Sequence, residues 1–155
     1  MSAQPTLTRL FAMIAFAGFA VHIATNVQLL QEGARVSAMF NTVAAVMAAV
    51  SGWMVAGPRI EARLVKSVFA MVQGVIAAAF LALAAGATVE TFRLGYKIRY
   101  DDLGEAMQGF FGYVAEGAQK LATPDILLAI GIFCLVGGLI LSLLFRMFEA
   151  RRNAR

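Results

Sequence analysis

The chain alternates between four long apolar stretches and short polar connections. Each stretch matches or exceeds the roughly 20 residues that a helix needs to cross the hydrocarbon core of a bilayer. Backbone polar groups find no water in lipid, and none of the stretches alternates polar with apolar residues, so we expect helices. The predicted membrane spans are residues 7–30, 36–56, 65–89 and 126–145.

The longest connection, between the third and fourth spans, has a pattern of its own. Its apolar residues recur at spacings of three and four, which is typical of an amphipathic helix: Leu103, Met107, Phe110, Val114, Ala118 and Leu121. We expect a helix over about 102–121, capped by Asp101 or Asp102, that lies on the membrane surface. The predicted fold is therefore all-α, with four transmembrane helices in a bundle and one amphipathic surface helix.

Composition supports a single membrane domain over residues 1–155. The chain is 61% hydrophobic and only 14% charged, which is too apolar for a soluble domain of this size. The first span is longer than the roughly 7 to 15 apolar residues of a secretory signal, so we expect it to remain in the protein. Neither a linker nor an internal repeat interrupts the sequence.

Lys and Arg are unevenly divided between the two sides that these spans define. The side with both ends of the chain and the second connection carries more of them than the opposite side. Because basic residues are retained in the cytoplasm, we expect both termini to be cytoplasmic, with the amphipathic helix outside. Topology and anionic headgroups account for the net charge of +4, so we expect no nucleic-acid partner.

Small residues form stripes along three of the spans. In the third span they occupy every fourth position and lead to Glu90: Ala70, Gly74, Ala78, Ala82 and Gly86. Similar stripes occur in the second span (Ala44, Ala48, Gly52, Ala56) and in the fourth (Cys134, Gly138, Ser142). Small residues let helices approach closely in lipid, so we expect a compact bundle within one chain, although the same chemistry suits a homo-oligomer.

Polar side chains inside the spans are candidates for function because they are costly in lipid. The first span carries His22, Asn26 and Gln28 near its outer end, and the second carries Asn41 at the same level. We expect these groups to form hydrogen bonds between helices. His22 is the only histidine, so one chain cannot hold a haem between two histidines, which leaves a haem held by His22 with a Met or with a second subunit as the alternative. The preferred interpretation of His22 is a hydrogen bond between helices or a water-exposed position near the outer interface.

Glu90 is the sharpest candidate among the acids. It follows the small-residue stripe of the third span, and acids that face a bundle interior often serve protons or ions. A pore or proton-coupled carrier centred on Glu90 would follow from that interpretation. Arg93 lies three residues further on, however, and an ion pair on one helix face is the preferred interpretation.

Two further groups of residues lie at opposite membrane boundaries. Trp53 and Arg59 flank the inner end of the second span, where we expect them to anchor the helix at the headgroups. On the outer side, Arg99, Tyr100 and Asp101 belong to a mixed basic and acidic cluster. Such a cluster suits an oxyanion or a partner's loop, or it satisfies its own charges on the surface.

The sequence offers no chemistry of a recognised catalytic type. We find no nucleophile with a base, no metal-ligand spacing and no glycine-rich phosphate loop, and Cys134 is the single cysteine. We therefore predict a protein that is not an enzyme and that holds neither a metal nor another cofactor.

Several short runs, in order along nearly the whole chain, resemble the TrgA family. They are Pro5-Thr6, Arg9-Leu10, Phe40-Asn41, Gly52-Trp53-Met54-Val55-Ala56-Gly57-Pro58-Arg59, Arg99-Tyr100-Asp101-Asp102 with Glu105-Ala106, and Gly137-Gly138. The chain departs from the family pattern at 60–63, where relatives tend to have glycines, and in its first span, which has Phe at Trp positions. The family label names a phenotype without a mechanism, so Trp53, Arg59, Tyr100 and Asp101 carry over only as signature positions.

The resemblance implies a small four-span alphaproteobacterial membrane protein associated with tellurite resistance. Our first hypothesis is therefore a non-enzymatic inner-membrane protein linked to tellurite or general oxyanion tolerance. The alternative is an accessory or structural subunit of a larger respiratory or transport complex, which would use its small-residue faces and surface helix for docking. Expected partners are the lipid bilayer and either other membrane subunits or further copies of the chain.

Overall fold

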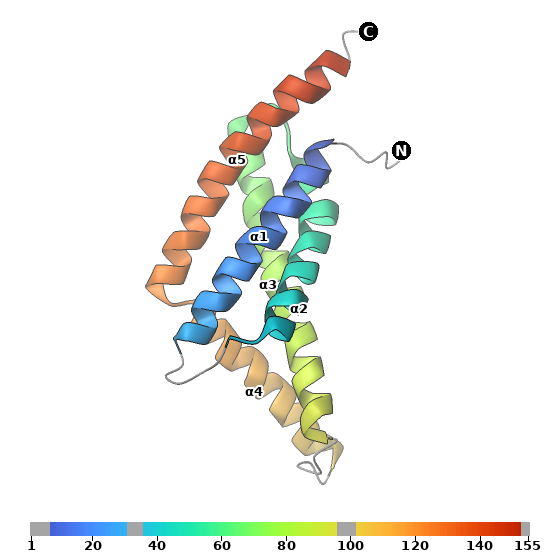
Figure 1. The fold of residues 1–155 in the computed structure, drawn as a ribbon, viewed down its shortest axis with the longest axis vertical. Helices are drawn as coiled ribbons and strands as arrows, with labels where there is room; N and C mark the ends of the chain where they lie inside the picture. The colour runs from blue at the N-terminus through green and yellow to red at the C-terminus, as the bar shows by residue number, and fades with distance from the viewer. Residues whose placement is uncertain (1–6, 31–35, 96–101, 153–155) are drawn as a thin grey trace.

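The protein is an all-α bundle, as the sequence predicts (Figure 1). The computed structural model describes residues 7–30, 36–95 and 102–152. The helices in these residues are α1 (Leu7–Leu29), α2 (Ala38–Ser51), α3 (Leu64–Gly95), α4 (Leu103–Leu121) and α5 (Pro124–Arg152). A π-helical turn, η1 (Gly52–Ala56), and a 3-10 turn, η2 (Gly57–Arg59), continue α2.

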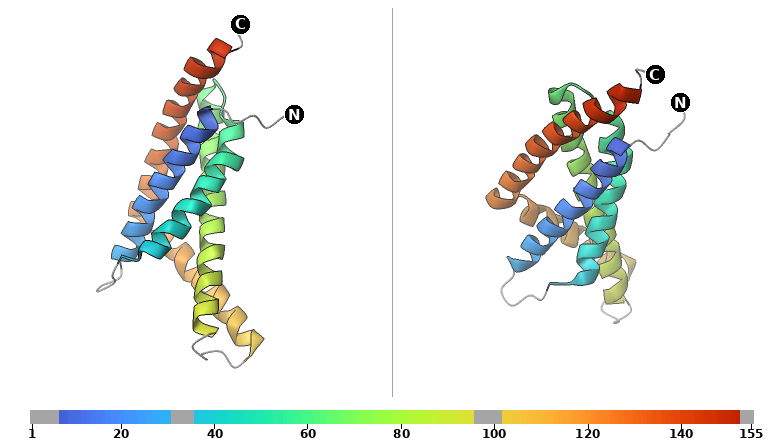
Figure 2. Two further views of the ribbon diagram at one scale, coloured as in Figure 1. Left: turned by 45° about the vertical axis from the view of Figure 1, so that its right-hand side comes forward. Right: turned by 45° about the horizontal axis from the view of Figure 1, so that its top comes forward.

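Four of these helical segments are long and apolar enough to cross a membrane, so the chain is a multi-pass membrane protein. Their bounds are Leu7–Leu29, Ala38–Arg59, Leu64–Gly95 and Pro124–Phe148. The start of α1, the end of α5 and the connection from η2 to α3 lie at one end of the bundle, here called the terminal end (Figures 1 and 2). The opposite end is called the α4 end.

Helix α3 is longer than the predicted span. The prediction ended at residue 89, before the first charged residues, whereas the helix continues to Gly95 and has 32 residues. At about 1.5 Å per residue it measures about 48 Å, well beyond the roughly 30 Å of a hydrocarbon core. Its last turns therefore extend past α1 and α2 at the α4 end, where α4 returns along them (Figure 1).

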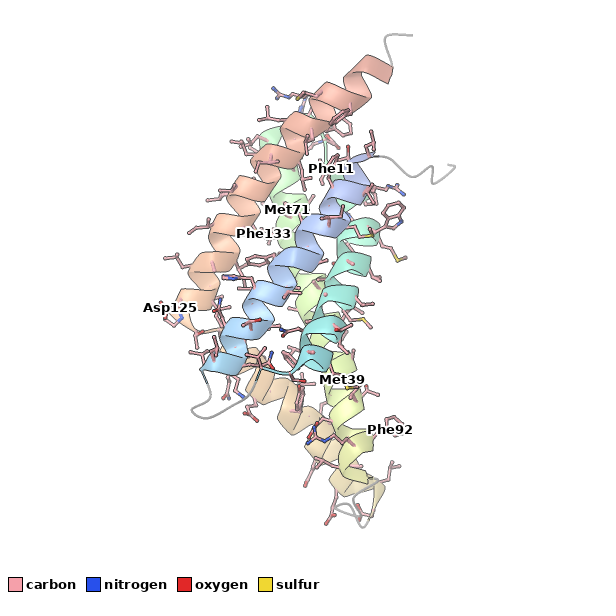
Figure 3. The ribbon with its side chains drawn as sticks, viewed as in Figure 1. Phe11, Met39, Met71, Phe92, Asp125 and Phe133 are labelled. Atoms are coloured by element: carbon pink, nitrogen blue, oxygen red, sulfur yellow. The ribbon has the colours of Figure 1, made fainter. Side chains whose placement is uncertain are left out.

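The terminal half of the bundle is closely packed through the predicted small-residue stripes. A Cβ atom at Gly52 would lie 2.8 Å from the Ala12 carbonyl oxygen, so η1 and α1 approach at backbone distance. A Cβ at Gly138 would lie 3.0 Å from the Cα of Val68, which joins α5 to α3 in the same way. The side chains of Phe16 and Met71 are among the largest fully buried ones, and Met71 is labelled in Figure 3. The prediction of close packing within one chain is confirmed.

Polar contacts fix the connection between η2 and α3. The Ser67 hydroxyl donates to the Glu61 carbonyl oxygen at 2.7 Å. From α5, the Arg146 guanidinium donates to the Ala62 carbonyl oxygen from Nε at 2.9 Å and from a terminal nitrogen at 2.6 Å. The connection is therefore held to the start of α3 and to the end of α5.

The predicted amphipathic helix is confirmed as α4. The Asp102 carboxylate caps it by accepting a hydrogen bond from the Glu105 backbone N–H at 2.8 Å. One face of α4 packs on α3, because Tyr113 lies against Gly86 and Leu83 lies against Gly117. A neighbouring apolar stripe of α4 stays exposed: Leu103, Met107 and Phe111. Its placement on a membrane surface stays a prediction.

Candidate functional site

The principal candidate site is a cavity in the half of the bundle nearer the α4 end. Its volume is about 580 Å³, and residues of α1, α2, α3 and α4 line it, together with Ile130 of α5. Small-molecule sites usually measure about 300 to 1,000 Å³ and combine apolar walls with a few polar groups. The cavity is therefore large enough to hold a ligand.

The small-residue stripe of α3 creates this space. Ala78 and Ala82 line the cavity with methyl groups, so α3 contributes little volume there. On the terminal side, Phe19 of α1 stacks on Phe133 of α5 with ring centroids 3.9 Å apart, and Phe133 meets Phe16 edge-on at 5.4 Å (Figure 3). Phe16 and Phe19 also line the cavity, so this aromatic cluster borders the end of the cavity nearer the terminal end, here called the deep end.

Two ion pairs lie at the other end of the cavity, here called the mouth. Glu90 pairs with Arg93 of α3 at 3.5 Å, and Lys120 pairs with Glu116 of α4 at 2.6 Å. Glu90 and Lys120 are the more shielded members, with side chains 31% and 26% exposed against 63% for Arg93 and 61% for Glu116. The mouth thus carries both signs of charge: the acid is the shielded member of the α3 pair, and the base is the shielded member of the α4 pair.

Tyr113 lies near a carboxylate of each pair, Glu90 and Glu116, on the α4 face that packs on α3. Burial raises the pKa of its phenol above the ordinary value of 10.0, and the charges of Glu90 and Glu116 raise the pKa further. A raised pKa keeps the phenol protonated at neutral pH. Tyr113 therefore supplies a hydroxyl hydrogen-bond donor at the mouth.

A polar network between α1 and α2 borders the same end of the cavity. Gln28 donates from Nε2 to Oδ1 of Asn41 at 2.7 Å, and Asn41 donates from Nδ2 to Oγ1 of Thr25 at 3.1 Å. Gln28 also accepts from the Ser37 backbone N–H at 2.6 Å. The predicted interhelical hydrogen bonds of Gln28 and Asn41 are confirmed.

Of the two interpretations of His22, the structure shows the exposed position and not a hydrogen bond to another helix. Nε2 of His22 and Nδ2 of Asn26 lie 3.1 Å apart and bond along α1 instead of to a neighbouring helix. The four-residue spacing places both on one face of α1, where His22 is exposed.

The remaining predicted residues are dispersed. The Glu90–Arg93 ion pair is confirmed and belongs to the cavity mouth. Trp53 and Arg59 lie near the terminal end, where the Arg59 guanidinium donates to the Val55 carbonyl oxygen of its own helical segment at 2.7 Å. Arg99, Tyr100 and Asp101 lie outside the described residues.

Sequence reasoning missed the α4 contribution to the mouth: Tyr113, Glu116 and Lys120. The four-residue spacing of Glu116 and Lys120 did signal an ion pair on one helix. Which face of α4 meets α3 depends, however, on Gly86 and Gly117 providing room for Tyr113 and Leu83. That pairing has no local signal in the sequence.

The chemistry available at this site is binding through apolar contacts, charges and hydrogen bonds. Across 7–30, 36–95 and 102–148, no three His, Cys, Asp or Glu side chains come together as metal ligands. No protein-family model, no curated protein and no solved structure matches this chain.

Proposed function

We propose that this chain is a non-enzymatic bacterial inner-membrane protein that contributes to tolerance of tellurite and related oxyanions. The proposal rests on the resemblance to the TrgA family. The observation that carries it is the conformation of the longest resembling run, residues 52–59. This run forms the π-helical and 3-10 turns of η1 and η2 and packs its glycines against α1.

The glycines of this run occupy positions where a side chain does not fit. A Cβ at Gly52 would lie 2.8 Å from the Ala12 carbonyl oxygen, and one at Gly57 would lie 2.9 Å from Cγ of Arg9. Arg9 belongs to another of the resembling runs. Two separate signature segments thus pack on each other, which is expected when a signature records a shared architecture and not a catalytic centre.

We further propose that both termini are cytoplasmic, so that the α4 end faces outward. At that end the exposed guanidinium of Arg93 precedes the connection that contains Arg99. Guanidinium groups suit oxyanions because they donate parallel hydrogen bonds from a fixed planar fork. Tellurite arriving from outside would meet these groups first.

Growth across a tellurite gradient tests this proposal. A strain without the gene is compared with strains carrying the wild type, the double variant Arg99→Ala with Asp101→Ala, or Arg59→Ala as a control at the terminal end. We expect the wild type and the control to restore growth and the double variant to fail, with equal protein in the membrane fraction. Unchanged growth of the deletion strain would refute the proposal.

The alternative function is an accessory subunit of a larger membrane complex. The exposed stripe of Leu103, Met107 and Phe111 favours it, because these apolar side chains lie outside the bundle and next to the face that packs on α3. Extraction in a mild detergent would bring down a partner in constant proportion, and Met107→Glu would release it. Recovery of the chain as a monomer would count against this function.

A further inference from the structure

We propose that the cavity binds one zwitterionic phospholipid from the leaflet on the α4 side, with phosphatidylethanolamine as the headgroup class. An acyl chain would occupy the apolar interior, and the headgroup would lie at the two ion pairs of the mouth. This inference is independent of the tellurite proposal, since it rests only on the shape and chemistry of the cavity.

The polar lining is confined to one end of the cavity. The charged and hydroxyl groups of Glu90, Arg93, Tyr113, Glu116 and Lys120 all lie at the mouth, where Gln28 and Ser37 join them. Towards the deep end the lining is apolar, from Ile23 and Val43 to Phe16, Phe19 and Val75. A small oxyanion gains nothing from such a deep end, whereas an amphiphile matches both parts.

The depth of the cavity corresponds to one leaflet. Val75 lines the deep end and Glu90 lines the mouth on the same helix. The rise between them is about 22 Å at about 1.5 Å per residue. Half of a bilayer that measures about 40 to 45 Å with its headgroups has nearly this thickness. A phospholipid aligned with α3 would therefore reach from the headgroup level to the centre of the membrane.

The charges at the mouth favour a zwitterionic headgroup over an anionic one. Arg93 and Lys120 suit a phosphate, while Glu90 and Glu116 suit an ammonium group. The Tyr113 hydroxyl adds a donor for a phosphate or ester oxygen. Phosphatidylglycerol has the phosphate but lacks the ammonium group, so it would leave both carboxylates without a counterpart from the ligand.

Retention of lipid by the purified chain tests the site. The full chain is reconstituted in vesicles of equal parts phosphatidylethanolamine and phosphatidylglycerol with identical acyl chains. It is then extracted in mild detergent, and the retained lipid is measured by native mass spectrometry. We expect one phosphatidylethanolamine per chain, retained through detergent exchange. Equal retention of both lipids, or loss of all lipid, would overturn the proposal.

Cavity-filling variants separate this site from the lipid that surrounds any membrane protein. Ala82→Phe on α3 and Val43→Phe on α2 both place a ring in the cavity, so retention should fall about tenfold, which corresponds to about 1.4 kcal/mol. Ile76→Phe on the exposed face of α3 is the matched control and should retain lipid. Helical circular dichroism identifies misfolded variants. Unchanged retention in either folded cavity variant would refute the site.

Charge variants test the headgroup assignment separately. Glu90→Gln with Glu116→Gln removes both carboxylates and leaves the two bases, so the preference should shift from phosphatidylethanolamine towards phosphatidylglycerol. An unchanged preference would refute the role of the carboxylates in binding an ammonium group. Because neither lipid measurement involves tellurite, failure here leaves the growth experiment unaffected.

Discussion

The Ser51 hydroxyl donates a 2.6 Å hydrogen bond to the backbone carbonyl oxygen of Gly74, inside the bundle. Both residues are buried, and the bond joins α2 to α3. It lies next to the contact of Gly74 with Phe16 and Ala56, where a Cβ on Gly74 would meet both side chains within 3 Å. The hydrogen bond between α2 and α3 thus lies beside the close contact of Gly74 with Phe16 of α1 and Ala56 of η1.

Replacing Ser51 by Ala should lower the stability of the bundle by about 0.6 kcal/mol, the average for hydrogen bonds between membrane helices. Thr42→Ala is the control, because the Thr42 hydroxyl is exposed and bonds within its own helix to the Ala38 carbonyl oxygen. Reversible unfolding in mixed micelles, followed by circular dichroism, measures both. Equal losses in the two variants would contradict a special role for the bond between helices.

Gly52→Ala should destabilise the protein by about 1 to 3 kcal/mol, the usual cost of overpacking. The new Cβ would lie 2.8 Å from the Ala12 carbonyl oxygen, and a backbone atom cannot rotate away. Gly131→Ala is the matched control, since a Cβ there meets nothing within 4 Å. Thermal unfolding in detergent should show a loss for the first variant only. Similar melting temperatures would refute the packing argument.

Asn41→Leu should cost about 1 to 2 kcal/mol, because it removes two hydrogen bonds that join α1 to α2. The Gln28 amide would keep only its bond within α1 to the Ala24 carbonyl oxygen, and the Thr25 hydroxyl would lose the bond that it accepts from Asn41. His22→Leu is the control, because its bond to Asn26 lies within α1 and is exposed. Unfolding in mixed micelles should separate the two variants. A larger effect at His22 would indicate that the polar face of α1 acts elsewhere.

The Tyr113 phenol should ionise above the ordinary pKa of 10.0, because burial and then the charges of Glu90 and Glu116 raise its pKa. A pKa raised in the folded state means that the folded protein holds this proton more tightly than the unfolded chain. The resulting stability is fully present below pH 10 and is lost as pH rises through the folded pKa.

Ultraviolet absorption measures this titration, with Tyr113→Phe as the difference reference. Glu90→Gln with Glu116→Gln should lower the Tyr113 pKa without returning it to the ordinary value, since burial is the larger cause. A midpoint at the ordinary value in the wild type would show that the phenol is open to water and that α4 does not pack on α3 in solution.

The sequence identified the helices because their signals are local. A run of apolar residues is either long enough to cross lipid or it is not, and the spacing of Leu103, Met107 and Phe111 predicts α4 without reference to any other helix. The predicted third and fourth spans ended too early, at residues 89 and 145, because charged residues such as Glu90 and Arg146 end an apolar run without ending the helix. Helix α3 continues to Gly95 and α5 continues to Arg152.

The candidate site was only partly predictable. Glu90 and Arg93 were paired correctly, because their three-residue spacing on a helix decides the contact. The polar residues of α1 make two kinds of hydrogen bond. Gln28 bonds to Asn41 of α2, whereas His22 bonds to Asn26 within α1. The sequence places these residues at similar depth but does not say which side of α1 faces α2.

The sequence by itself determined the membrane class, the four spans, the amphipathic helix and the small-residue faces that pack. These follow from burial of the backbone in lipid and from helical periodicity, which are properties of a single segment. Only the tertiary structure decided that the α3 stripe packs tightly near Gly74 but lines a cavity at Ala78 and Ala82. At Gly74 the stripe packs against Phe16 of α1, whereas at Gly86 it packs against Tyr113 of α4. These contacts depend on the packing of several helices at once, so the sequence of a single helix does not reveal them.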